Sequence, residues 1–117
     1  MNTLKKTKEK IKAEPPHWRV FLMDFVDDFR HYKNPEMIAE PFEPGDDKID
    51  ALLASTAEYL CDELKMKIPA WLDDVRPCGE PFFVSGIENL KARAIVESPL
   101  RFRIRKIFVL EDFLSRV

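Results

Sequence analysis

Apolar side chains recur with the spacing of an α-helix in two long stretches, and this periodicity limits the fold more than any other feature of the chain. In the first stretch they lie at i, i+3, i+4, i+7, i+8 and i+11: Trp18, Phe21, Leu22, Phe25, Val26 and Phe29. In the second stretch the same spacing holds for Ile49, Leu52, Leu53, Thr56, Ala57, Leu60 and Leu64, and all of these except Thr56 are apolar. The sequence therefore predicts helices over residues 17–33 and 46–67, each with one broad face turned toward a core.

The rest of the chain alternates between proline-containing connectors and shorter helical segments. Single helical turns are predicted over residues 70–74 and 111–116. Ser85 followed by Glu88 matches a capping box and predicts a helix over residues 87–97. The side chains of this helix that we expect in the core are Leu90, Ala94 and either Ile95 or Val96.

A chain of 117 residues, 45% of them hydrophobic, has the length of one domain and the material for a core. We predict an all-α fold, a compact bundle of about five helices with aromatic-rich connectors. One short hairpin or extended pair between residues 82–84 and 104–109 fits the same pattern. We assign residues 17–117 to this single helical domain. Residues 1–16 carry five Lys and two Glu but little apolar surface, so we expect a basic, flexible leader without a buried face.

The densest positive charge outside the N-terminus lies in residues 97–109 and admits two interpretations. Apolar and basic residues alternate in the run Leu100-Arg101-Phe102-Arg103-Ile104-Arg105, which is typical of a half-buried strand. The preceding Ser98-Pro99 is instead a common opening of a helix. We favour a helical turn from Pro99 to about Arg103, followed by an extended segment through Val109.

Four side chains of this stretch form a candidate binding site, here called the basic strip: Arg101, Arg103, Arg105 and Lys106. In an extended segment the three arginines would share one face and contact successive phosphates of a nucleic acid. The alternative is that they pair with the acidic body of the chain, for example at Asp24–Asp28. Residues 17–90 hold seven basic and sixteen acidic residues, a net charge of −9, whereas residues 91–117 hold seven basic and three acidic residues, a net charge of +4.

The two cysteines do not indicate a disulfide framework or a catalytic arrangement. Cys61 lies beside the apolar stripe of the second long helix, so we expect a buried, inert thiol. Cys78 lies between Pro77 and Gly79, so we expect it to be exposed and more reactive. No base lies near it in the sequence, and we therefore expect no enzyme activity.

Metal, cofactor and membrane sites are likewise not indicated. His17 and His31 are isolated from the cysteines and from each other. Asp24, Asp27, Asp28 and His31 share one helix face, and a solvated acidic face explains them better than a metal site. No phosphate-binding glycine motif suggests a cofactor, and no small-molecule substrate is indicated. The longest apolar runs are about four residues, which predicts a cytoplasmic protein without a membrane segment.

Several motifs resemble those of a group of small, uncharacterised bacterial proteins. They are Trp18…Phe25…Asp28-Phe29-Arg30, Ala57-Glu58-Tyr59-Leu60, Pro69-Ala70-Trp71, Glu80-Pro81-Phe82-Phe83 and, most specific, Glu97-Ser98-Pro99…Phe102-Arg103…Arg105…Ile107-Phe108-Val109. In that group a similar module also occurs behind helix-turn-helix domains, so the resemblance implies a role in regulation. It implies no catalytic residues, and the 16-residue leader is too short for a DNA-reading domain.

Three hypotheses about function follow, each with a structural consequence. The first is a non-catalytic module that binds a protein partner or itself, which requires an exposed apolar patch or a dimer. The second is nucleic-acid binding through the basic strip, which requires these side chains to project outward without acidic partners. The third is a thiol or metal enzyme around Cys78 or the acidic helix face, which requires a cleft and a nearby base or ligand. We favour the first.

Overall fold

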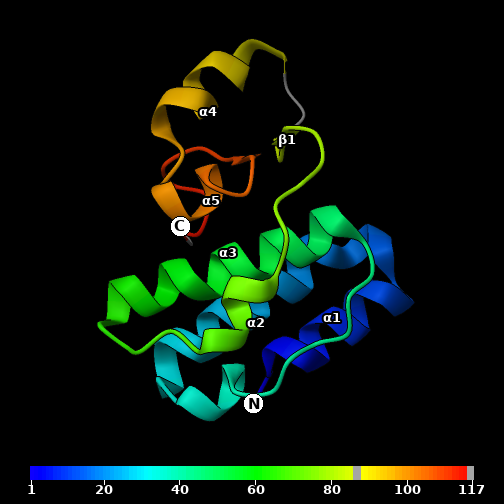
Figure 1. The fold of residues 1–117 in the computed structure, drawn as a ribbon, viewed down its shortest axis with the longest axis vertical. Coiled ribbons are helices and arrows are strands. Elements are labelled where there is room, and N and C mark those ends of the chain that lie inside the picture. The colour runs from blue at the N-terminus through cyan, green and yellow to red at the C-terminus, as the bar shows by residue number, and fades with distance from the viewer. Residues whose placement is uncertain (86–87, 116–117) are drawn as a thin grey trace.

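The structure consists of helices around one hydrophobic core, with a short pair of strands near the C-terminus (Figure 1). This computed structural model describes residues 1–85 and 88–115. The α-helices are α1 (Leu4–Ala13), α2 (Trp18–Tyr32), α3 (Asp47–Leu64), α4 (Lys91–Glu97) and α5 (Leu100–Arg103). Turns of 3-10 helix cover Pro15–His17, Pro35–Ile38, Ala70–Asp74 and Glu88–Leu90, and the strands are β1 (Phe82–Phe83) and β2 (Ile107–Phe108). The prediction of a mostly α-helical bundle with one short extended pair is confirmed.

Helices α2 and α3 are the two long helices that the periodicity predicts, and they supply the centre of the core. The fully buried side chains of α2 are Leu22, Phe25, Val26 and Phe29. Helix α3 begins where the Asp46 carboxylate accepts hydrogen bonds from the backbone N–H groups of Lys48 and Ile49. It ends at Lys65, which adopts the left-handed conformation that commonly terminates helices.

The N-terminal segment differs from the expected leader because it forms α1 and has a buried face. Leu4 and Ile11 are buried together with Thr7 and Lys8, at the helical spacing i, i+3, i+4 and i+7. Helix α1 packs on α2 and α3. The sequence analysis did not recognise this buried face because two of its four residues, Thr7 and Lys8, are polar. Lys8 enters it because Asp50, on α3, supplies a buried counter-charge.

The C-terminal part of the chain packs on α3 from the other side. In Figure 1, α3 lies between α1 and α2 below and α5 above. Strands β1 and β2 pair in parallel, with Phe82 opposite Ile107 and Phe83 opposite Phe108. The parallel direction makes this an extended pair and not a hairpin. The rings of Phe83 and Phe108 stack with their centroids 5.1 Å apart.

Helix α4 is shorter and more exposed than the sequence predicts. It starts at Lys91 after the 3-10 turn Glu88–Leu90, and two positions of the predicted capping box, residues 86–87, lie outside the described residues. Ala94 is buried as expected. Ile95 and Val96 are 48% and 77% exposed, so the prediction that one of them enters the core is wrong. A helix of two turns contacts the fold through a narrow face, and here that face centres on Ala94.

The overall dimensions match a compact unit of this length. The radius of gyration of the Cα atoms is 13.3 Å, and a folded domain of this size is expected near 13 Å. None of the helices in the described ranges is both long and apolar enough to cross a lipid bilayer.

Candidate interaction surface

Residues 97–109 fold as the helical turn α5 followed by strand β2, which confirms the favoured interpretation of this stretch. The buried Ser98 hydroxyl donates a hydrogen bond to the Ile107 carbonyl at 3.0 Å and accepts one from the Val109 N–H at 3.2 Å. Phe102 is buried against Tyr59 of α3, with ring centroids 5.9 Å apart. Residues 97–109 therefore pack the C-terminal part of the chain against α3.

Arg105 of the basic strip lies inside the protein and not on a binding surface. Only 5% of the residue is exposed, and its guanidinium pairs with Glu58 of α3. It also donates hydrogen bonds to the Leu72 carbonyl at 2.8 Å and the Val75 carbonyl at 3.3 Å. These partners engage all three guanidinium nitrogens, so Arg105 is not available to a phosphate or an acidic ligand.

The other members of the basic strip lie at the surface but face different partners. Arg101 pairs with Asp62 of α3 through two hydrogen bonds of 2.8 and 3.2 Å, and this pairing raises the pKa of its guanidinium. Arg103 donates to the carbonyls of Val96 and Ser98 at the end of α4. Arg103 and Lys106 are exposed, and no carboxylate in the described ranges pairs with either of them.

The three arginines therefore do not share one face. A shared face required an extended chain, in which every second side chain points the same way, and residues 100–103 are helical. The helical turn rotates these residues around α5, and Lys106 then takes a positive φ of 61° before β2 begins. The acidic partners lie on α3 at Glu58 and Asp62, not at Asp24–Asp28.

Four large apolar side chains are exposed on α4, α5 and the residue after α5, and we call them the apolar patch: Ile95, Val96, Leu100 and Ile104. Leu100 and Ile104 are one helical turn apart, joined by a backbone hydrogen bond of 3.0 Å. Arg103 bridges from α5 to the Val96 carbonyl, which brings the end of α4 beside α5. Val96 and Leu100 are 77% and 68% exposed, far beyond what an aliphatic side chain in a packing face shows.

Both cysteines are buried, which contradicts the expectation of an exposed Cys78. Cys78 is 3% exposed. Its backbone N–H donates a hydrogen bond of 3.0 Å to the Arg105 carbonyl, beside the parallel strands. Burial raises the pKa of the Cys78 thiol, and burial raises that of Cys61 to about 11. Both thiols are therefore protonated near neutral pH and are poor nucleophiles. The expectation of a buried Cys61 is confirmed.

The acidic face of α2 shows no metal-binding geometry. In the part of the chain that the structure describes, no three His, Cys, Asp or Glu side chains gather into a cluster able to hold a metal ion. The Asp28 carboxylate instead accepts hydrogen bonds from the Asn2 backbone N–H at 2.8 Å and from its side-chain amide at 3.0 Å. This contact anchors the chain just before α1.

Sequence reasoning missed the apolar patch because it assigned Ile95 or Val96 to the core and considered Leu100 and Ile104 only as apolar residues that alternate with the arginines. A second stripe on α3 was the available signal for the packing of the C-terminal segment. Its small and polar members recur at helical spacing and are all buried: Ala51, Ala54, Ser55, Glu58 and Cys61. A carboxylate within such a stripe indicates a buried cation from elsewhere in the chain.

Comparison of this chain with models of protein families, with curated proteins and with solved structures finds no match in any of the three. The resemblance to small bacterial proteins therefore stays a prediction.

Proposed function

We propose that the protein is a non-catalytic interaction module that binds a partner protein through the apolar patch. The observation that carries this proposal is the concentration of exposed aliphatic side chains, Ile95, Val96, Leu100 and Ile104, within ten residues of chain. Water must order around such a surface when it is free, and covering it with a partner recovers that free energy.

The charges beside the patch favour an acidic partner. Arg103 and Lys106 are exposed, and the structure supplies no carboxylate for them in the described ranges. A symmetric dimer through the patch would bring these two cations toward their own copies, because the same surface meets itself across a two-fold axis. The best-matched occupant is therefore a different protein that presents an apolar surface bordered by Asp or Glu side chains.

Nucleic-acid binding through the basic strip has less support. Two of its four members already have carboxylate partners, since Arg105 pairs with Glu58 inside the protein and Arg101 pairs with Asp62. Arg103 and Lys106 alone form a small electrostatic footprint. An enzyme based on the cysteines has no support from their surroundings, because both thiols are buried and the pKa of each is raised.

The test is affinity capture from a lysate of the source cells, followed by binding measurements with each purified candidate partner. The chain carrying Val96→Ser and Leu100→Ser is compared with the wild type, with and without nuclease. The matched control is Val20→Ser, because Val20 is 58% exposed on α2 and lies outside the patch. We expect a nuclease-resistant partner whose affinity falls at least about tenfold with the double change and stays unchanged in the control.

Charge reversal at Arg103 and Lys106 is an independent test of whether the partner binds at this surface. Arg103→Glu and Lys106→Glu should slow association with an acidic partner and flatten its dependence on salt. Equal binding by the patch variant and the Val20→Ser control would rule out the patch as the interface. Loss of all capture on nuclease treatment, together with sensitivity to Arg103→Glu, would point to the nucleic-acid alternative.

A further inference from the structure

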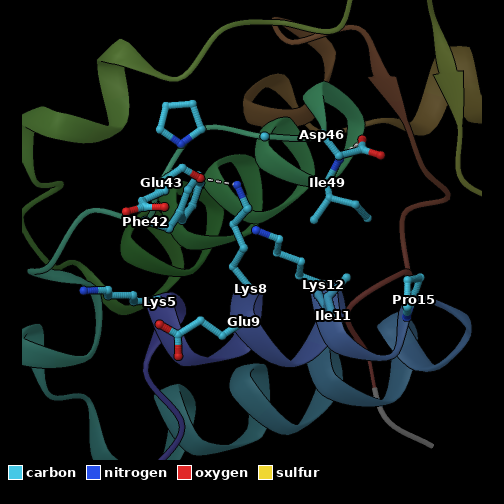
Figure 2. Close-up of a pocket in the computed structure, with 12 residues that line it drawn as sticks. Lys5, Lys8, Glu9, Ile11, Lys12, Pro15, Phe42, Glu43, Asp46 and Ile49 are labelled. Atoms are coloured by element: carbon cyan, nitrogen blue, oxygen red, sulfur yellow. Dashed lines mark hydrogen bonds between the residues drawn. The ribbon is translucent and has the colours of Figure 1, made fainter.

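A pocket of about 490 Å³ lies between α1, the loop before α3 and the first turn of α3 (Figure 2). We call it the lysine pocket. Its apolar walls include Ile11 of α1, Phe42 of the loop and Ile49 of α3. Small-molecule sites in proteins typically enclose about 300–1,000 Å³ and combine apolar walls with a few polar groups. The size and lining of this pocket are in that class, although the sequence indicated no small-molecule ligand.

Three lysines line the pocket, Lys5, Lys8 and Lys12, and the ammonium group of Lys8 is fixed by the protein. Lys8 is 9% exposed, pairs with Asp50 and donates a hydrogen bond to the Glu43 carbonyl. Its Nζ also lies 4.7 Å from the centroid of the Phe42 ring. Gly45 leaves room for this arrangement, because a Cβ there would lie 3.3 Å from Lys8 Nζ. The position of this ammonium group is therefore set before any ligand arrives.

The ammonium group of Lys12 is not held by an ion pair within the described residues. Lys12 is exposed one helical turn after Lys8, and no carboxylate in the described part of the chain forms an ion pair with it. Figure 2 shows the side chains of Lys8 and Lys12 directed into the same space between Phe42 and Ile49. The two ammonium groups therefore point into the same part of a pocket whose lining is half apolar and half charged.

The acidic side chains around the pocket do not neutralise Lys12. Asp46 accepts hydrogen bonds from the first turn of its own helix. Lys5 pairs with Glu40 at 2.7 Å, and Figure 2 shows Lys5 and Glu9 directed away from Lys8 and Lys12. Among the described residues, the pocket thus keeps one ammonium group without an ion pair, beside a buried, paired one. The nearby carboxylates of Glu9, Glu43 and Asp46 repel anions, and they disfavour a ligand with several negative charges most strongly.

We propose that the lysine pocket binds a small amphipathic monocarboxylate, with its carboxylate between Lys12 and Lys8 and its apolar body against Ile11, Phe42 and Ile49. A carboxylate there replaces water around the Lys12 ammonium group, which forms no ion pair with a described residue, and accepts charge-assisted hydrogen bonds. The apolar part of the ligand would contact Ile11 and Phe42, which are 4% and 7% exposed, and the half-buried Ile49. This site is independent of the apolar patch.

The test is a titration of the isotope-labelled full chain, followed by the backbone amide signals in NMR spectra. The probes are 3-phenylpropionate and octanoate. Two controls lack one half of the proposed chemistry: 3-phenylpropionamide has no charge, and acetate has no apolar body. We expect saturable shifts at residues 8–12 and 42–49 with the first two probes, and dissociation constants about three- to tenfold larger for the amide than for 3-phenylpropionate.

The side-chain test is Lys12→Gln, with Lys6→Gln as its matched control. Both residues are exposed on α1, but only Lys12 lines the pocket, so both variants should keep the fold. Lys12→Gln should weaken 3-phenylpropionate about three- to tenfold and leave the amide unchanged, and Lys6→Gln should change neither. The proposal fails if neither carboxylate gives saturable shifts, if the amide binds as tightly as the acid, or if the two variants weaken binding equally.

Discussion

At the scale of single residues, Arg105 is the side chain whose role differs most from its appearance in the sequence. Glu58 and Arg105 are 1% and 5% exposed, and they link α3 to the turn between α5 and β2. A planar guanidinium is suited to this place because it reaches the carboxylate and two carbonyls at once. The carbonyls belong to Leu72 and Val75, so one side chain joins three segments that are distant in the chain.

Replacing Arg105 should therefore cost far more stability than replacing its neighbour Arg101. Arg105→Ala leaves Glu58 buried and unpaired, and we expect a loss of about 3–5 kcal/mol in the free energy of unfolding. Arg101→Ala removes an exposed pair with Asp62 and should cost less than about 1 kcal/mol. Urea denaturation followed by circular dichroism measures both.

A double change separates the buried charge from the packing around it. Glu58→Leu with Arg105→Met removes both charges, so the loss should be smaller than for Arg105→Ala alone. Similar stabilities of the Arg105→Ala and Arg101→Ala variants would show that the pair is hydrated in solution and that Arg105 is free to bind a ligand.

At the scale of elements, α1 shows how tertiary contacts stabilise a helix that its sequence alone does not. A helix of 10 residues is marginal in water. Thr3 caps its first turn by accepting a hydrogen bond from the Lys6 N–H at 3.1 Å. The larger contribution comes from Leu4 and Ile11, which enter the core beside the Lys8–Asp50 pair.

Two Leu→Ala changes distinguish a packed α1 from a solvated leader. Leu4 is fully buried, so Leu4→Ala should lower the free energy of unfolding by about 2–5 kcal/mol through lost burial and a cavity. Leu100 is 68% exposed in the apolar patch, so Leu100→Ala should change it by less than about 0.5 kcal/mol. Thermal and urea unfolding curves of the two variants provide the comparison. If Leu4→Ala leaves the free energy of unfolding unchanged, residues 1–13 form the solvated leader that the sequence predicts and do not pack on the core.

At the scale of the whole molecule, the two candidate sites lie on different parts of the fold. The apolar patch belongs to α4, α5 and the residue after α5, which lie above α3 in Figure 1, whereas the lysine pocket lies against α1, below α3. Helix α3 lies between them and contacts both α1 and α5. A ligand in the pocket and a partner on the patch can therefore be bound at the same time.

The charges around the patch also predict the oligomeric state. Self-association through the patch would oppose Arg103 and Lys106 of two copies, so we expect a monomer at micromolar concentration and physiological salt. Sedimentation velocity should give the mass of one chain for the wild type and for the Val96→Ser and Leu100→Ser variant. A dimer that the double change dissociates would instead make a second copy the occupant of the patch.

The sequence by itself determined α2, α3, the burial of Cys61 and the turn-then-strand course of residues 97–109. These features depend on periodicity, caps and prolines, which act between residues a few positions apart. Only the tertiary structure decided that Lys8, Cys78 and Arg105 are buried, and that Val96 and Leu100 are exposed. The burials depend on residues far away in the chain, such as Asp50 for Lys8 and Glu58 for Arg105, whereas Val96 and Leu100 are exposed because the rest of the described chain leaves them uncovered. A local pattern shows which side chains share a face of a helix or strand, but it does not show which part of the chain packs against that face.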